Sequence, residues 1–228
     1  MRPTHKKRNA GFSILELMIA MTLMLAALGI ISAVMSSAFS VRARESRTSD
    51  ALSTAQAAIG VVSREVSNSG FGLYDDATSK IANNGIVLTE SGANRIRIRS
   101  NQFNAGGTPT APGPTTLVLN EPGEDVTYFF DAATNSIVRH DPNGLGIGSG
   151  QTSVVVNQIS NVTFEYYDYT GGTSVATGPL TTPTRNTGRV RIIVDVNLDP
   201  VVGQPDNQRV TFASDVTLRN NSYMLQQY

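Results

Sequence analysis

The sequence contains no cysteine, no tryptophan and only two histidines, His5 and His140. Without cysteine there are no disulfides, so a folded domain of this chain is held together by packing alone. The two histidines are far apart and do not form a pair at metal-ligand spacing, and no G-x-S-x-G or phosphate-loop pattern is present. We find no catalytic constellation and expect no enzymatic activity, cofactor or metal. His140, beside Asp141, is interpreted as a turn residue at a strand end.

Charged residues are also few, at 16% of the chain, and balanced at 18 basic against 18 acidic. Four of the basic residues lie in Met1–Gly11, so loss of that segment would leave 14 against 18, a formal charge of −4. This balance argues against a general polyanion-binding protein. The 20 glycines, with frequent serine, threonine and asparagine, are typical of a β-rich domain with many turns.

The longest uncharged stretch is apolar and runs from Leu17 to Val41. A helix of this length can cross a hydrocarbon core of ~30 Å. The basic segment before it is expected to stay in the cytoplasm, which places the chain after Arg42 outside. A secretory signal peptide would have a shorter apolar region of about 7–15 residues, so we predict a membrane anchor instead.

Glu16 is unusual because it lies at the start of this apolar stretch. An unpaired acidic residue at the centre of a membrane helix costs roughly 2.5–3.5 kcal/mol, and less near its boundary. One interpretation is a capping box, since Ser13 and Glu16 have the S-x-x-E spacing. Another begins with cleavage between Gly11 and Phe12, which would give Phe12 a free α-amino group. Glu16 would then lie one helical turn from a positive charge, its own or that of a neighbouring protomer.

The segment Gly11-Phe-Ser-Ile-Leu-Glu16-Leu-Met-Ile-Ala20, with its basic leader, resembles the processing site of type IV prepilins and type II secretion pseudopilins. The resemblance implies that a membrane prepilin peptidase cleaves after Gly11 and methylates the new amino group of Phe12. It also implies that Glu16 acts in assembly against the amino terminus of an adjacent subunit. An ordinary signal anchor with a chance glutamate is the alternative.

After Val41 the helix is expected to continue as an amphipathic segment and to end at 67–70, where Ser-Asn-Ser-Gly stops it. Its apolar residues recur at spacings of 3, 4, 3 and 4, which indicates one buried face. We expect this face to cover the chain's own sheet rather than to form a free coiled coil. The face consists of Leu52, Ala55, Ile59, Val62 and Val66.

The remainder predicts an antiparallel sheet with one buried and one wet face. The predicted strands are Ile86–Leu88, Arg95–Arg99, Thr116–Leu119, Val126–Phe130, Ser136–Arg139, Val154–Ile159, Val162–Tyr169, Arg189–Asn197 and Arg209–Arg219, with loops at 104–114 and 170–188. The expected fold is α+β, a long N-terminal membrane-spanning α-helix packed on an antiparallel β-sheet head. The expected regions are a leader (1–11), a transmembrane half-helix (12–41), an amphipathic half-helix (42–69) and a β-rich head (70–228).

Two clusters in the head could bind ligands. Asp141–Gly144 has the oxygen-rich character of a calcium loop, but the following Leu-Gly-Ile-Gly lacks alternate oxygen ligands, so we interpret it as a turn. Arg95, Arg97 and Arg99 share one strand face that could contact phosphates. No aromatic residues are interleaved with them, so we interpret a solvated strand face and do not expect DNA binding.

Shorter segments from the end of the helix onward resemble PilW-type minor pilins and the pseudopilin J branch of type II secretion. They include Arg64-Glu65-Val66 followed by Gly70-Phe71-Gly72, the stretch 154–167, and Val216-Thr-Leu-Arg-Asn220. The chain departs from many major pilins by lacking a helix proline and a disulfide.

The resemblance implies a non-catalytic minor pilin that helps to initiate type IV pilus assembly and has a place at the filament tip. Its partners would be other minor and major pilins, the prepilin peptidase and the inner-membrane assembly platform. It would cross the inner membrane once, with its head outside the cytoplasm, and enter the pilus after assembly. The alternatives are a minor pseudopilin of type II secretion and a signal-anchored exported enzyme or binding domain.

Overall fold

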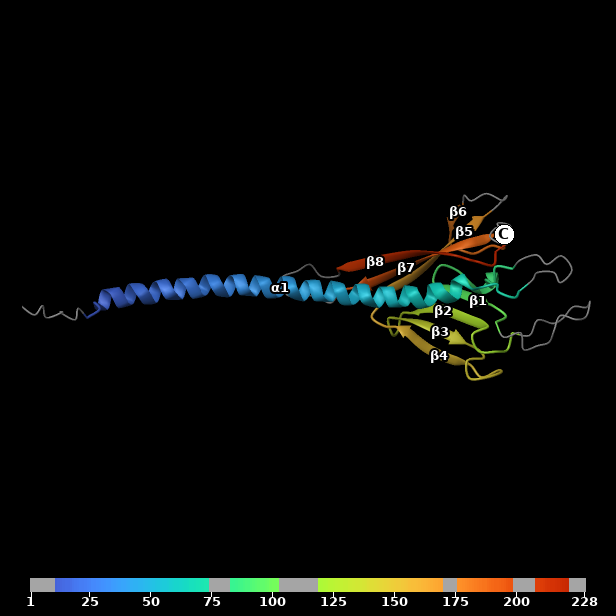
Figure 1. Cartoon of the computed structure of the whole chain (residues 1–228), viewed down its shortest axis with the longest axis horizontal. Helices are drawn as coiled ribbons and strands as arrows, with labels where there is room; N and C mark the ends of the chain where they lie inside the picture. The colour runs from blue at the N-terminus through green and yellow to red at the C-terminus, as the bar shows by residue number, and fades with distance from the viewer. Residues whose placement is uncertain (1–10, 74–82, 103–118, 170–175, 199–207, 222–228) are drawn as a thin grey trace, which may run out of the picture. The chain divides into compact units, whose positions relative to one another are not determined.

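The computed structural model describes residues 11–73, 83–102, 119–169, 176–198 and 208–221. The chain divides into two units, at the boundary between Ser46 and Arg47. The described elements are α1 (Ile14–Ser67), the 3-10 helix η1 (Leu88–Glu90), β1 (Arg95–Arg99), β2 (Asp125–Asp131), β3 (Ser136–Asp141), β4 (Gln151–Val156), β5 (Asn161–Tyr169), β6 (Ala176–Leu180), β7 (Thr187–Asn197) and β8 (Arg209–Thr217) (Figure 1). The basic residues of the predicted leader lie outside the described residues.

The first unit contains the N-terminal part of α1. Every large apolar side chain from Phe12 to Val41 is exposed, because nothing in the described part of this unit covers the helix. Of the helices in the described residues, α1 is the one that is long and apolar enough to cross a membrane. These observations support the prediction of a single N-terminal membrane anchor.

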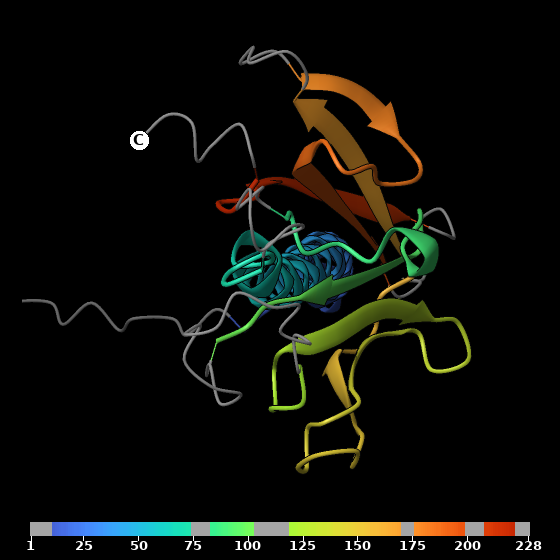
Figure 2. The same ribbon diagram turned by 90° about the vertical axis from the view of Figure 1, so that its right-hand side faces the viewer.

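The second unit contains two four-stranded antiparallel sheets instead of the single sheet predicted. Their strand orders are β1-β2-β3-β4 and β6-β5-β7-β8. The last turns of α1 lie between the two sheets (Figure 2). The chain just before β1 joins the sheets, since the Phe164 N–H donates to the Ala93 carbonyl at 2.6 Å and the Tyr166 hydroxyl donates to the Gly92 carbonyl at 2.9 Å. One core cluster therefore includes side chains from α1 and from both sheets.

The buried face of α1 differs in part from the predicted one. Ala55, Val62 and Val66 are fully buried as expected, but Leu52 is 37% exposed and Ile59 is only partly buried. Ala51 and Ala58 are buried in their place. With 3.6 residues per turn, either Ala51 or Leu52, and either Ala58 or Ile59, can face inward. The small alanine side chains let the strands pack close to the helix.

The strand predictions also need three corrections. Ile86 forms only an isolated bridge with Ile98, and η1 follows it, so the predicted strand at Ile86–Leu88 is wrong. The strand expected at Val154–Ile159 is β4, which begins earlier and ends at Val156. β6 lies within the expected loop 170–188, and its glycine and proline hid it from sequence analysis; proline is tolerated in such an edge strand. Most of Thr116–Leu119 and the whole loop 104–114 lie outside the described residues.

The end of α1 agrees with the prediction. The helix ends at Ser67, and Gly70 and Gly72 have φ of +78° and +68°, which is the left-handed region that favours glycine. The chain after β8 returns to this point, where the Arg219 N–H donates to the Ser67 carbonyl at 3.2 Å.

The strand alternation is confirmed in β7, in which Val190, Ile192, Val194 and Val196 are all buried.

Candidate functional site

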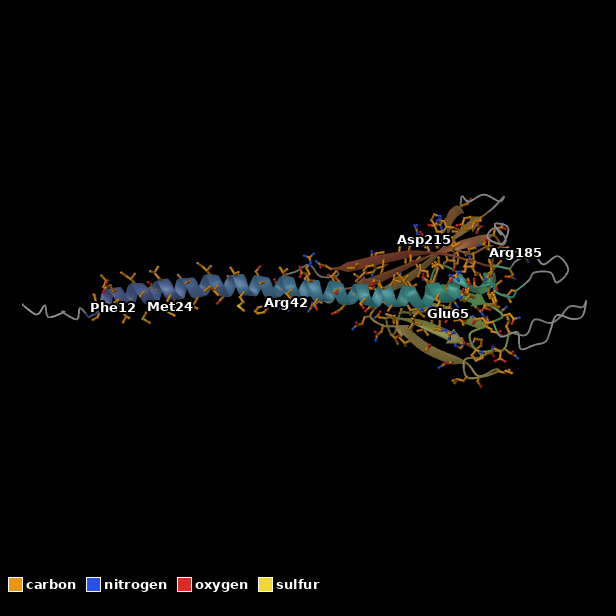
Figure 3. The ribbon with its side chains drawn as sticks, viewed as in Figure 1. Phe12, Met24, Arg42, Glu65, Arg185 and Asp215 are labelled. Carbon is orange, nitrogen blue, oxygen red and sulfur yellow. The ribbon has the colours of Figure 1, made fainter. Side chains whose placement is uncertain are left out.

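The site residues predicted from the sequence lie at the start of α1. Gly11, Phe12 and Ser13 precede the helix and are exposed, and Phe12 is 87% exposed (Figure 3). A side chain built on Gly11 would meet no described atom within 4 Å. The Gly11–Phe12 peptide bond is thus outside the hydrogen-bonded helix, where a protease can bind it without unwinding α1.

Ser13 and Glu16 form the predicted capping box. The Ser13 N–H donates to Glu16 Oε2 at 3.1 Å, and the Leu15 N–H donates to Ser13 Oγ at 3.3 Å. The Ser13 carbonyl accepts the Leu17 N–H at 3.1 Å, the first bond of the helical ladder. The glutamate satisfies a free backbone donor and places negative charge at the positive end of the helix dipole.

This geometry also determines which cations Glu16 can reach. Its carboxylate points back along the chain to the backbone of Ser13, the residue that follows Phe12. The next basic residue of the helix is Arg42, 26 positions further on, or roughly 39 Å along the axis at 1.5 Å per residue. Within the described residues, therefore, no basic side chain of α1 lies within reach of Glu16, and an amino terminus created at Phe12 or a neighbouring molecule could supply a cation. The predicted salt bridge between protomers stays a prediction.

The arginine stripe of β1 is not the solvated face that we expected. Arg97 donates to both oxygens of Asp125 at 2.7 Å and to Glu90 at 2.5 Å, and Arg99 donates to Asp125 at 3.0 Å. Asp125 comes from β2, the neighbouring strand, which sequence analysis did not pair with β1. Arg95 alone of the three is exposed. Arg97 and Arg99 thus direct their donors within the sheet rather than toward a phosphate backbone.

The Asp125 network predicts a loss of stability in acid. Burial favours a raised pKa for Asp125, but hydrogen bonds from Arg97 and the charge of Arg99 outweigh it and hold the pKa below its ordinary value of 3.8. A carboxyl group with a lowered folded-state pKa stabilises the fold above its unfolded-state pKa and loses that contribution as pH falls through the folded-state value. Asp125→Asn should lower the free energy of unfolding by about 2 kcal/mol at pH 7, since it leaves two guanidinium groups underpaired.

The measurement is urea unfolding at a series of pH values, for wild type and for Asp125→Asn. The difference between them should shrink as the pH falls below the ordinary carboxyl value of about 4 and through the lower pKa of Asp125 in the folded protein. Asp215→Asn is the matched control, because Asp215 pairs with Arg191 at 2.9 Å on the exposed side of a sheet, where an ion pair contributes little. A difference that stays constant from neutral to acid pH would contradict the assignment to Asp125.

A second network joins α1 to β3. Arg139 donates to both oxygens of Glu65 at 3.2 Å and lies 3.4 Å from Asp141. The Tyr128 hydroxyl is buried here without a hydrogen bond of normal geometry, and burial together with the nearby Glu65 raises its pKa. Glu65 and Arg139 are 74 residues apart, so no local sequence signal could have paired them. This network stabilises the helix against the sheet.

The turn interpretation of Asp141–Gly144 is confirmed. Asp141 accepts the N–H groups of Asn143 at 2.9 Å and Gly123 at 2.7 Å, and the Asn143 side chain accepts the Gly148 N–H at 2.9 Å. These oxygens therefore stabilise the loop backbone. His140 lies inside β3, one residue before the strand ends, and pairs with Thr127 and Thr152, so it is a strand residue and not the turn residue that we expected. Its Nδ1 lies 2.9 Å from Thr152 Oγ1. In the described ranges no three His, Cys, Asp or Glu side chains gather to hold a metal ion.

Comparison with protein-family models, curated proteins and solved structures finds no match to this chain. The pilin resemblance thus depends on the residues around Gly11 and on the membrane-length helix that follows them.

Proposed function

We propose that this chain is a pilin-like subunit, anchored by α1 and processed between Gly11 and Phe12. In this role it is a minor pilin that helps to initiate type IV pilus assembly and catalyses nothing itself. The observation that carries the proposal is the Gly11-Phe12-Ser13…Glu16 order at an exposed helix start, directly before a membrane-length apolar helix. Each part is common alone, but together they fit a substrate of a prepilin peptidase.

The placement of Glu16 supports an assembly role. In a membrane its carboxylate would have only the backbone of Ser13 as a partner within its own helix. An ionised group with so little compensation favours any arrangement that supplies a cation. Cleavage after Gly11 creates such a cation at Phe12, either in the same chain or in a neighbour. A pairing between neighbours would set the axial stagger of adjacent helices.

The exposed apolar surface of α1 supports the same role. Its large side chains project around the helix between Phe12 and Val41 with no described residue covering them, as Met24 illustrates (Figure 3). In a membrane this surface contacts lipid, and in a filament it would contact the helices of other pilins. The same features suit a type II secretion pseudopilin, which uses the same processing and packing.

The decisive experiment is intact mass and N-terminal sequencing of the protein from native membranes. A chain that begins at N-methylated Phe12 supports the proposal. A chain that begins at Met1, in cells with an active prepilin peptidase, rejects it in favour of an ordinary signal anchor. Deletion of the gene then separates the two systems, because loss of twitching motility indicates a pilus and loss of protein export indicates type II secretion.

Glu16→Ala tests the assembly role. We expect cleavage to continue, since the Gly11–Phe12 bond lies outside the helix, but copurification with other pilins should fall about tenfold, equivalent to the loss of roughly 1.4 kcal/mol of binding free energy. Glu16→Gln separates charge from capping, because glutamine can also complete a capping box. If the glutamine variant copurifies as well as wild type, capping is sufficient and the salt-bridge argument is wrong. Glu45→Ala, an exposed glutamate later in α1, is the matched control.

A further inference from the structure

The β8 strand forms one edge of its sheet, with β7 on its only paired side in the described residues. The Leu218 N–H donates to the Gly188 carbonyl, so residues 188 and 218 form a hydrogen-bonded pair. Antiparallel ladders alternate such pairs with non-hydrogen-bonded ones. The odd-numbered residues from Arg209 to Thr217 therefore direct their N–H and C=O groups away from β7. Arg219 follows the same alternation, and its N–H is the one that donates to Ser67 of α1.

A groove lies between this free edge and the last turns of α1. Its volume is about 690 Å³, and it is open to solvent. Ser214, Asp215, Val216 and Thr217 line one side, and Gly60, Ser63, Arg64 and Ser67 line the other. The bond from Arg219 to Ser67 closes one end. The volume is within the range of ligand pockets, which suits a short peptide segment better than a folded domain.

Gly60 lines the helical side of the groove and leaves space there. A side chain built on Gly60 would meet no other atom within 4 Å. Glycine in the middle of a helix costs about 1 kcal/mol relative to alanine, and here no close packing requires it. The hydroxyl of Ser63 is shielded from solvent and has no hydrogen-bond partner among the described residues.

The charge of the groove favours an acidic ligand. Arg64 and Arg219 are both exposed, and neither forms an ion pair with a described residue. The acidic lining residue, Asp215, is neutralised by two bonds to Arg191, at 2.9 and 3.0 Å. Two guanidinium groups thus remain available at the end where β8 meets the helix, and carboxylates are their natural partners.

We propose that this groove binds an extended acidic segment of a partner protein as an added strand on β8. The outward N–H and C=O groups of β8 pair with the backbone of the segment, and Arg64 and Arg219 bind its carboxylates. Long, uncovered edge strands are uncommon because they invite unwanted pairing, whereas strand addition is an established mode of peptide recognition. The site lies in the second unit and does not depend on cleavage of α1.

The test uses the full chain in detergent micelles and a blocked, fluorescein-labelled peptide of nine residues, matching the nine residues of β8. Valine alternates with glutamate in this peptide, and a companion peptide carries glutamine in place of glutamate. Fluorescence anisotropy up to ~1 mM protein detects weak binding. We expect the glutamate peptide to bind at least about tenfold more tightly than the glutamine peptide at low salt and to lose that advantage at high salt.

Substitutions locate the site. Arg64→Gln combined with Arg219→Gln should reduce the affinity for the glutamate peptide to that for the glutamine peptide. Arg95→Gln, which removes an exposed arginine from β1, should change it by less than about twofold. Gly60→Leu should weaken binding of both peptides, because the new side chain occupies the groove. Leucine also favours the helix, so a urea midpoint equal to or above that of wild type will show that the protein remains folded.

Hydrogen exchange gives an independent readout, because peptide binding should slow exchange at the odd-numbered amides of β8. Equal affinity for both peptides, no binding, or protection confined to β4 or β6 would overturn the proposal. The proposal would also be overturned if Arg95→Gln lowered the affinity for the glutamate peptide as much as the combined Arg64→Gln and Arg219→Gln substitutions. Concentration-dependent self-association that the peptide displaces would instead identify a second copy of this chain as the occupant, which also overturns it.

Discussion

Gly11→Val should leave the chain at its full length when it is coexpressed with a prepilin peptidase, whereas wild type should be shortened by the mass of its leader. Valine is restricted at χ1 and in its backbone, and it adds bulk beside the bond that the peptidase must approach. In this chain the substitution itself is harmless, because a side chain on Gly11 meets no described atom within 4 Å. Loss of cleavage would thus report recognition by the peptidase and not misfolding.

Gly29→Val is the matched control for this experiment. Gly29 also lies in the first unit, and a side chain there likewise meets nothing within 4 Å. This variant should be cleaved at the wild-type rate, as judged by the shift in intact mass. Efficient cleavage of Gly11→Val would remove the basis for the processing site. Uncleaved protein should also reproduce the assembly defect of Glu16→Ala, because Phe12 then lacks its α-amino group.

Gly85→Ala should lower the free energy of unfolding by at least about 3 kcal/mol, more than the other stability variants proposed here. An alanine in the left-handed region is strained, and its side chain would overpack the site. Gly85 has φ of +74°, and a side chain there would collide with the backbone of Gly70 and with the Arg99 carbonyl. The chain is close here because the Gly70 N–H donates to the Arg99 carbonyl at 2.8 Å and the Arg99 N–H donates to the Gly85 carbonyl at 2.7 Å. The substitution would separate the end of α1 from β1.

Gly148→Ala separates backbone strain from collision. Gly148 has nearly the same φ, +71°, but a side chain there meets nothing within 4 Å. It should cost only about 1 kcal/mol, the strain of a left-handed alanine. Urea unfolding followed by tyrosine fluorescence measures both variants, since the chain has seven tyrosines and no tryptophan. Equal losses for Gly85→Ala and Gly148→Ala would show that the close backbone approach contributes nothing.

Local patterns were sufficient to predict several features. The uncharged stretch from Leu17 to Val41 predicted a helix long and apolar enough to cross a membrane, and Ser13 with Glu16 predicted how it begins. The glycines after Ser67 determined where α1 ends, because only glycine adopts the required left-handed φ at low cost. The alternation in β7 and β8 predicted which side chains face inward. All of these features depend on neighbouring residues, so the sequence contains their physical cause.

The tertiary structure decided how these pieces combine. Two sheets rather than one surround the end of α1, and Ala51 and Ala58 face inward where Leu52 and Ile59 were expected. Arg97 and Arg99 became partners of Asp125 because β1 and β2 are neighbours. The groove beside β8 also depends on a long-range contact, because the chain after the strand returns to Ser67 of α1. Such contacts join residues that are far apart in the chain, and their energies depend on how the whole head packs, so local patterns cannot predict them.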